Sequence, residues 1–295
     1  MKLGLGTVQF GLDYGITNRG GRPHAEVVRQ ILELAARTDI DTLDTAALYG
    51  DSERVIGDAL PRPHDFRIVT KTLALDPRLN PADAIATIEA GVVASLQRLK
   101  EPRIYGLLLH RVDDLLGPLG EQLFAKLEGL KAQGLVEKIG VSLYTPSEVD
   151  AVLSRYAPDL VQLPLNPFDQ RHLASRSLER LAAASVEIHV RSAFLQGLLL
   201  ASPANPPPQL AELAPKLLQW RRLLEKQNLP PLQGCFGFLQ GIPQLGYVIC
   251  GATNLVEWQE ILAAWQSAPM ICTETFKELS VSDVKLIDPR FWPQP

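Results

Sequence analysis

The 295-residue sequence has few cysteines, no long hydrophobic run and no strong excess of either charge. Its three cysteines, Cys235, Cys250 and Cys272, are too sparse and too widely spaced for a disulfide framework or a zinc site, and no metal site is predicted. No window approaches the roughly 18 consecutive apolar residues of a membrane-spanning helix. The formal net charge is −4 and the basic residues are scattered, which argues against a nucleic-acid partner. Because the N-terminal residues also lack the apolar core of a signal peptide, we expect a cytoplasmic protein.

The sequence does contain a regular alternation of short β-branched runs with longer amphipathic runs. Eight runs have strand character, and they are Leu3–Val8, Thr42–Asp44, Arg67–Lys71, Ile104–His110, Glu137–Leu143, Leu160–Leu165, Glu187–Ser192 and Tyr247–Cys250. Strands that alternate with helices pair in parallel through right-handed crossovers. Eight such units predict an α/β fold, a (β/α)8 TIM barrel formed by residues 1–295 as a single domain. A doubly wound sheet is the alternative, but no Gly-x-Gly-x-x-Gly fingerprint follows the first strand.

Two of the predicted helices carry clear start signals. Asn80 followed by Pro81 marks the start of a helix that runs to about Leu99. Thr145 with Glu148 three residues later forms a capping-box pattern before a second helix. The other helical segments are His24–Arg37, Ser52–Leu60, Gly120–Gln133, Arg176–Ala184, Ala211–Glu225, Leu232–Gln240 and Leu255–Trp265.

Several predicted strands end in a polar or ionisable residue. Asp44 ends the second strand, with Tyr49 in the loop that follows it, and Lys71 and His110 end the third and fourth strands. The later strand ends supply Ser142, Gln162, Asn166, Arg191 and Ser192. In a barrel all carboxyl strand ends face one mouth, where polar groups are typically functional. Each of these residues alone is more often structural, but their order at consecutive strand ends favours a site.

On these residues the chain resembles the aldo-keto reductase superfamily over nearly its whole length. The resemblance rests on Leu5-Gly6-Thr7, Asp44-Thr45-Ala46, Tyr49-Gly50, Ser52-Glu53, Gly57, Thr70-Lys71, Leu108-Leu109-His110, Gly140-Val141-Ser142 and Gly251-Ala252. It implies a catalytic tetrad of Asp44, Tyr49, Lys71 and His110. It also implies an NAD(P)H-dependent oxidoreductase that reduces an aldehyde or ketone to an alcohol.

The chemistry of these four side chains suits carbonyl reduction. Lys71 beside Tyr49 is expected to favour the phenolate and lower the pKa of the phenol, with Asp44 holding the ammonium group in place. Tyr49 then gives a proton to the substrate oxygen, while the nicotinamide cofactor supplies the hydride to the carbon. His110 can donate a hydrogen bond to the same oxygen as negative charge develops there.

The resemblance also implies cofactor contacts at the later strands. Ser142 and Gln162 match residues that bind the nicotinamide amide, whereas Leu143 stands where many relatives have Asn. Arg191 stands where an aromatic residue often stacks on the nicotinamide ring, and a guanidinium plane can stack in the same way. The pyrophosphate segment is matched by Ser192, Phe194 and Gln196, and the adenosine end by Gly251, Thr253, Asn254 and Glu260.

The identity of the dinucleotide is less well specified by the sequence. NADP(H) is the cofactor that the resemblance favours. However, Gly251 and Glu257 stand where relatives committed to NADPH often carry Lys or Arg. Because a carboxylate repels a phosphate, NAD(H) or dual use stays open.

The substrate is expected to bind among the loops around the mouth. The candidates are Phe10, Asp13, Tyr14, Leu48, Arg111 and Phe168. The mixture of apolar and polar groups among these residues suits a small carbonyl compound, including a sugar-like one. Two alternatives stay open: a cofactor-binding sensor or partner subunit with little turnover, and a lyase or isomerase with Lys71 as a Schiff base. The sequence predicts no oligomeric state.

Overall fold

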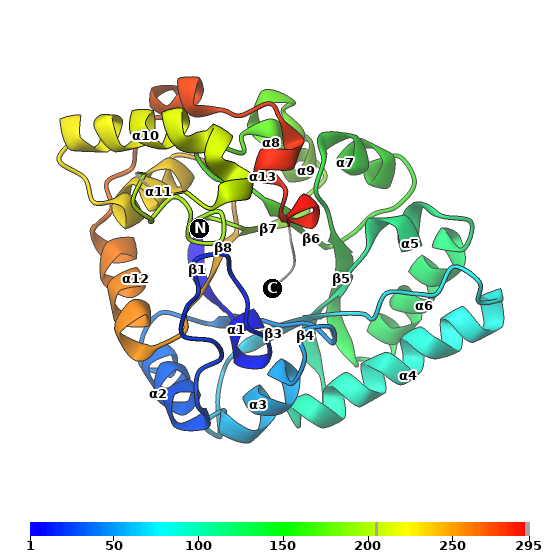
Figure 1. The fold of residues 1–295 in the computed structure, drawn as a ribbon. Helices are drawn as coiled ribbons and strands as arrows, with labels where there is room; N and C mark the ends of the chain where they lie inside the picture. The colour runs from blue at the N-terminus through cyan, green and yellow to red at the C-terminus, as the bar shows by residue number, and fades with distance from the viewer. Residues whose placement is uncertain (204–205, 293–295) are drawn as a thin grey trace.

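Eight parallel strands close into a barrel in the computed structural model, which describes residues 1–203 and 206–292. The strands lie side by side in chain order, and β1 pairs with β8 to complete the ring. They are β1 (Lys2–Gly6), β2 (Thr42–Asp44), β3 (Arg67–Lys71), β4 (Ile104–Leu109), β5 (Val136–Ser142), β6 (Leu160–Pro164), β7 (Glu187–Arg191) and β8 (Tyr247–Gly251). Helices surround this ring (Figure 1). The predicted (β/α)8 barrel is therefore confirmed.

The helices lie between consecutive strands in the sequence, except for α12 and α13, which follow β8. They are α1 (Val8–Gly11), α2 (Ala25–Ala36), α3 (Ser52–Ala59), α4 (Pro81–Leu99), α5 (Val112–Leu116), α6 (Gly120–Ala132), α7 (Pro146–Leu153), α8 (Arg171–Ala174), α9 (Ser177–Ala183), α10 (Ala214–Lys226), α11 (Pro231–Gln240), α12 (Leu255–Ser267) and α13 (Val284–Ile287). Three 3-10 segments add to them: η1 (Pro208–Leu213), η2 (Thr273–Leu279) and η3 (Pro289–Phe291). Within the described ranges, no helix is long and apolar enough to cross a membrane.

Both predicted helix starts are present. The Asn80 side chain accepts a hydrogen bond from the Asp83 backbone N–H, and Pro81 occupies the first turn of α4. Thr145 and Glu148 form the reciprocal capping box at the start of α7. These contacts satisfy backbone N–H groups that have no partner inside the helix.

The first strand differs from the prediction at its end. The apolar run continues to Val8, but β1 stops at Gly6 and residues 8–11 form the short helix α1. Gly11 of this turn lies against the loop after β2, because a Cβ added there would lie 1.8 Å from the Tyr49 carbonyl oxygen. Only glycine permits this close approach. Because β1 ends at Gly6, α1 packs directly against the segment that carries Tyr49.

The amino ends of the strands carry a network of polar side chains. The Glu187 carboxylate accepts hydrogen bonds from the Tyr105 hydroxyl at 2.9 Å and from the Lys138 ammonium group at 2.6 Å. The His189 Nε2 atom lies 2.7 Å from the other Glu187 oxygen. These hydrogen bonds from cationic and neutral donors hold the pKa of Glu187 at about 2, although burial alone would raise it. The network therefore ties β4, β5 and β7 together at the end opposite the barrel mouth.

Candidate active site

A buried ion pair lies at the carboxyl ends of β2 and β3. The Lys71 Nζ atom lies 2.7 Å and 2.9 Å from the two carboxylate oxygens of Asp44, and it donates a third hydrogen bond to the Thr45 carbonyl oxygen at 2.9 Å. Lys71 is 1% exposed and Asp44 is 4% exposed. Burial lowers the pKa of Lys71, and the Asp44 carboxylate opposes that change. All three ammonium protons have acceptors, which is the condition under which a buried charge is tolerated.

Tyr49 lies over this ion pair, in the loop after β2. The Lys71 Nζ atom is 4.8 Å from the centroid of the Tyr49 ring. The His110 ring meets the same ring edge-on, with centroids 5.8 Å apart and planes at 84°. Lys71, Tyr49 and His110 come from three different strand ends, so the barrel brings together the residues that the sequence predicted at the mouth.

The expectation that Lys71 lowers the pKa of Tyr49 needs correction. Burial of the phenol raises the pKa of Tyr49 well above its ordinary value, and the negative charge of Asp44 raises it further. Lys71 lies over the ring and is neutralised by Asp44, so its charge does not reverse these effects. Tyr49 therefore keeps its proton at every pH at which the protein would be assayed.

His110 follows directly after β4 and its ring is neutral. Burial lowers the pKa of His110 to about 3, and the nearby charges of Lys71 and Arg191 act in the same direction. The Nδ1 atom is buried and has no hydrogen-bond partner among the described residues. A neutral imidazole carries one N–H group that can be donated to a bound oxygen atom.

Gln162 on β6 forms a hydrogen bond to the Asp44–Lys71 ion pair. Its amide nitrogen donates a hydrogen bond to the Asp44 Oδ2 atom at 2.7 Å. Its amide oxygen is buried and has no partner within the described part of the chain. An unsatisfied buried acceptor is costly, and a ligand N–H group would satisfy it.

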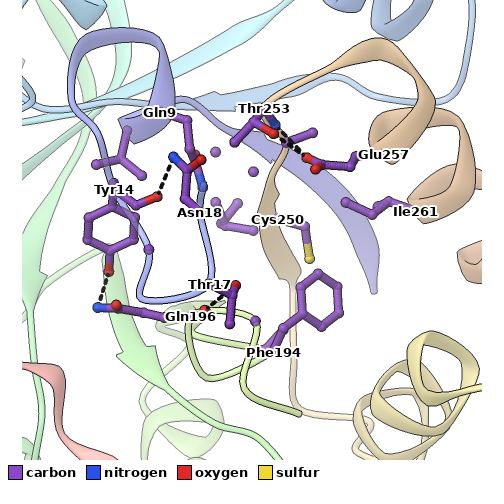
Figure 2. A pocket seen from close by; sticks show the side chains of 18 of the residues that line it. Gln9, Tyr14, Thr17, Asn18, Phe194, Gln196, Cys250, Thr253, Glu257 and Ile261 are labelled. Atoms are coloured by element: carbon purple, nitrogen blue, oxygen red, sulfur yellow. Dashed lines mark hydrogen bonds between the residues drawn. The ribbon is translucent and has the colours of Figure 1, made fainter. Parts of the chain in front are cut away.

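A cavity of about 630 Å³ is lined by Tyr49 and Gln162 and by Glu257 and Ile261 of α12. Figure 2 shows the part of it around Tyr14, Gln196, Thr253 and Glu257. Most of the residues that sequence reasoning assigned to the cofactor line it, namely Gln162, Arg191, Ser192, Phe194, Gln196, Gly251, Thr253, Asn254 and Glu260. Tyr14, Asp44 and Tyr49 line the same space. Its volume is within the usual range of ligand pockets, roughly 300–1,000 Å³.

Other predicted site residues do not line this cavity. Ser142 is buried at the end of β5, and Phe10 is packed in the hydrophobic core on α1. Phe168 is also part of the core. Leu48 and Arg111 lie on the exposed rim, where the Arg111 guanidinium group is 4.0 Å from Asp113. The exposed Asp13 lies 3.9 Å from Arg22 on the loop after β1.

Arg191 stacks on a protein side chain. Its Cζ atom lies 3.9 Å from the ring centroid of Tyr144, and one of its terminal nitrogens donates to the Leu143 carbonyl oxygen at 3.2 Å. The Arg290 Cζ atom lies 3.5 Å from the same centroid. Two guanidinium groups this near one centroid must occupy opposite ring faces, so Tyr144 is enclosed between them. No spacing in the sequence predicts this stack, because its members come from β7, the loop after β5 and η3.

Sequence reasoning also missed most of the loop after β1. Gln9, Thr17, Asn18, Arg19 and Gly20 all line the cavity. The loop is joined to the segment after β7 through Gln196, which donates to the Tyr14 hydroxyl at 3.2 Å and accepts from the Ile16 N–H at 3.1 Å (Figure 2). Its glycine and asparagine content indicates a loop but not the direction in which the loop folds.

The residues of this cavity fit a nicotinamide dinucleotide. Gln162 offers a buried acceptor without a partner near Tyr49, where the reactive ring would have to lie. At the other end the space is bounded by Thr253 and Asn254, which precede α12. Within the described ranges, His, Cys, Asp and Glu side chains form no group able to hold a metal ion.

Comparisons with known proteins agree with this geometry. A model of the Aldo/keto reductase family matches residues 2–279. Among solved structures, a Pseudomonas aeruginosa protein assigned to the aldo-keto reductases is 25% identical, with a TM-score of 0.68 and 90% of each chain covered. Aldo-keto reductase AKR11C1 from Bacillus halodurans, in its holo form, is 21% identical, with a TM-score of 0.76 and coverages of 95% and 92%. Glycerol dehydrogenase AKR11B4 from Gluconobacter oxydans is 19% identical, with a TM-score of 0.70 and coverages of 99% and 93%. A search of curated protein sequences found no match.

Proposed function

The chain belongs to the aldo/keto reductase family, and we propose that it is an oxidoreductase that reduces an aldehyde or ketone to an alcohol with a nicotinamide dinucleotide. One observation carries this proposal: the ammonium group of Lys71, held by Asp44, lies under the Tyr49 ring beside a neutral His110. The cofactor, when bound, supplies the hydride. The protein's own residues supply the proton, the electrostatic environment and the position of the substrate.

Tyr49 is the proposed proton donor. Its raised pKa keeps the hydroxyl protonated, so the acid form is the resting form. The carbonyl oxygen becomes a strong base only as its carbon is reduced, and the proton of Tyr49 moves to it at that stage. The Lys71 ammonium group, whose Nζ atom lies 4.8 Å from the ring centroid, offsets only part of the charge of the phenolate that remains, because Lys71 is already paired with Asp44. General acid catalysis of this kind is typically worth about 10²–10⁴ in rate.

His110 is the proposed second donor to the substrate oxygen. Because its pKa lies at about 3, the ring is neutral throughout the working pH range and does not compete with Tyr49 as an acid. Its N–H group can still stabilise negative charge on the oxygen without giving up a proton. Tyr14 and Arg191 line the same space as Tyr49 and are the proposed contacts for the rest of a small, polar or sugar-like substrate.

The experiment that tests this proposal separates binding from turnover. Quenching of tryptophan fluorescence reports binding of NADH and NADPH, and loss of the 340 nm absorbance reports reduction of a panel of aldehydes, ketones and sugars. We expect Tyr49→Phe to bind the dinucleotide as the wild type does and to lose reduction. Full activity of Tyr49→Phe would contradict the assigned mechanism. Binding of cofactor without turnover of any substrate would favour a sensor or partner subunit, and borohydride trapping of a substrate on Lys71 would favour a Schiff-base enzyme.

A further inference from the structure

Glu257 places a carboxylate at the end of the cavity formed by α12. The carboxylate accepts a hydrogen bond from the Thr253 backbone N–H and another from the Thr253 hydroxyl, both at 2.7 Å. The Asn254 side chain in turn accepts from the Glu257 N–H at 2.9 Å. Figure 2 shows the Thr253 and Glu257 side chains next to each other and joined by these hydrogen bonds. The Thr253 N–H, the Thr253 hydroxyl and the Glu257 N–H are therefore already paired with the chain's own oxygen atoms.

The layout of the cavity determines which part of a bound dinucleotide lies beside Glu257. The nicotinamide must reach Tyr49, the proposed proton donor, and the fully buried Gln162 presents an unpartnered oxygen atom there. The cavity continues from that point to Glu257, Glu260 and Ile261. A dinucleotide that fills it therefore has its adenosine half, including the ribose 2′ position, at the start of α12.

The charges at this end disfavour a 2′-phosphate. Of the described residues that line the cavity, Arg19 and Arg191 are the cationic ones. Arg191 is stacked on Tyr144 at the end near Tyr49, and Arg19 lies on the loop after β1. Residues 251–261 supply no Lys or Arg, whereas Glu257 and Glu260 bring two carboxylates. Glu257 also lies in the first turn of α12, where its charge offsets the positive end of the helix dipole.

We propose that Glu257 makes this protein select NAD(H) over NADP(H), by accepting hydrogen bonds from a free ribose diol and repelling a 2′-phosphate. The inference rests on the proposed function, because it requires the nicotinamide to lie at Tyr49. An acidic side chain that binds the adenosine ribose hydroxyls is a known physical solution for NAD in other nucleotide-binding folds. A phosphate at the same position would meet the Glu257 carboxylate, and residues 251–261 supply no Lys or Arg to offset that charge.

The test compares dissociation constants for NADH and NADPH measured by tryptophan fluorescence quenching at fixed ionic strength. The wild type should bind NADH more tightly. Glu257→Gln keeps an oxygen for Thr253 but removes the charge and an acceptor for the ribose hydroxyls, so NADPH binding should tighten about five- to ten-fold while NADH binding weakens. Glu257→Arg should reverse the preference. Glu260→Gln is the matched control: it removes a carboxylate of the same helix and cavity that is not hydrogen-bonded to Thr253, and it should shift the NADH-to-NADPH ratio much less than Glu257→Gln does.

Three results would overturn the inference. The first is a wild type that binds NADPH more tightly than NADH. The second is an equal change of the ratio in Glu257→Gln and Glu260→Gln. The third is an Arg19→Gln variant that loses NADPH affinity alone, which would make Arg19 the group that binds a 2′-phosphate; an equal loss for both cofactors is the result that we expect. Failure of both dinucleotides to bind would instead overturn the proposed function.

Discussion

Gln162 donates a hydrogen bond of 2.7 Å to the Asp44 carboxylate, across 118 positions of sequence and from the far side of the barrel. Asp44 thereby has fixed donors on both oxygen atoms, with Lys71 as the other donor. The side chain predicted to bind the nicotinamide amide thus also orients the carboxylate that holds Lys71.

We expect Gln162→Leu to lower kcat about ten-fold, because the Asp44 carboxylate loses a buried donor and about 1–3 kcal/mol of hydrogen-bond energy. A residue that only binds cofactor would raise the Kd of the cofactor and leave kcat unchanged. Steady-state kinetics at saturating cofactor, together with the Kd from fluorescence, separate the two roles. An unchanged kcat with weakened cofactor binding would show that the contact with Asp44 has no catalytic effect.

Asp44→Asn should destabilise the protein by about 3–5 kcal/mol, because it leaves the Lys71 ammonium group buried without its counter-ion. The double variant Asp44→Asn/Lys71→Met removes both charges and should recover part of that loss. Urea unfolding at neutral pH measures both variants. Equal stability of the single and double variants would contradict the idea that the unpaired charge is the cause.

Stability at acidic pH should depend on Glu187. Its pKa in the folded protein is about 2, below the ordinary value of 4.5, so the unfolded chain binds the proton more readily. Its contribution is therefore complete above pH 4.5 and is lost as the pH falls toward 2. The shift corresponds to about 3 kcal/mol at 1.36 kcal/mol per unit.

Between pH 5 and pH 3, the urea midpoint of unfolding should fall further for the wild type than for Glu187→Gln. The low pKa of His110 also makes the folded state less stable in acid, but it is common to both proteins and cancels in the difference. Parallel pH profiles for the two proteins would mean that the Glu187 network contributes no acid sensitivity.

Tyr144→Leu should loosen the last described segment of the chain, because it removes the ring between Arg191 and Arg290. Each cation–π contact is worth about 0.5–2 kcal/mol. Thermal unfolding should shift downward, and limited proteolysis should become faster within residues 283–292. Tyr144→Phe retains the ring and serves as the control. Equal protease sensitivity of the Leu and Phe variants would exclude a role for the stack.

The predictable part of the site consists of residues fixed by strand position. Asp44 and Lys71 are the last residues of β2 and β3, His110 directly follows β4, and parallel strands in a barrel bring their carboxyl ends to one mouth. The Tyr144 stack and the Gln196 contacts depend on the path of loops and of the C-terminal segment. The direction of the Tyr49 pKa shift depends on burial, which no spacing in the sequence reports. These features required the three-dimensional structure.

Strand β7 carries Glu187 at its first position and Arg191 at its last. One end of this five-residue strand belongs to the network that ties strands together, and the other end faces the ligand cavity. The two ends of the strand therefore belong to different parts of the molecule: Glu187 joins β4, β5 and β7, and Arg191 lines the cavity. Substitutions among the exposed loop residues at the mouth, such as Leu48, leave the Glu187 network untouched. The architecture thus leaves this enzyme open to divergence in substrate while its scaffold stays constant.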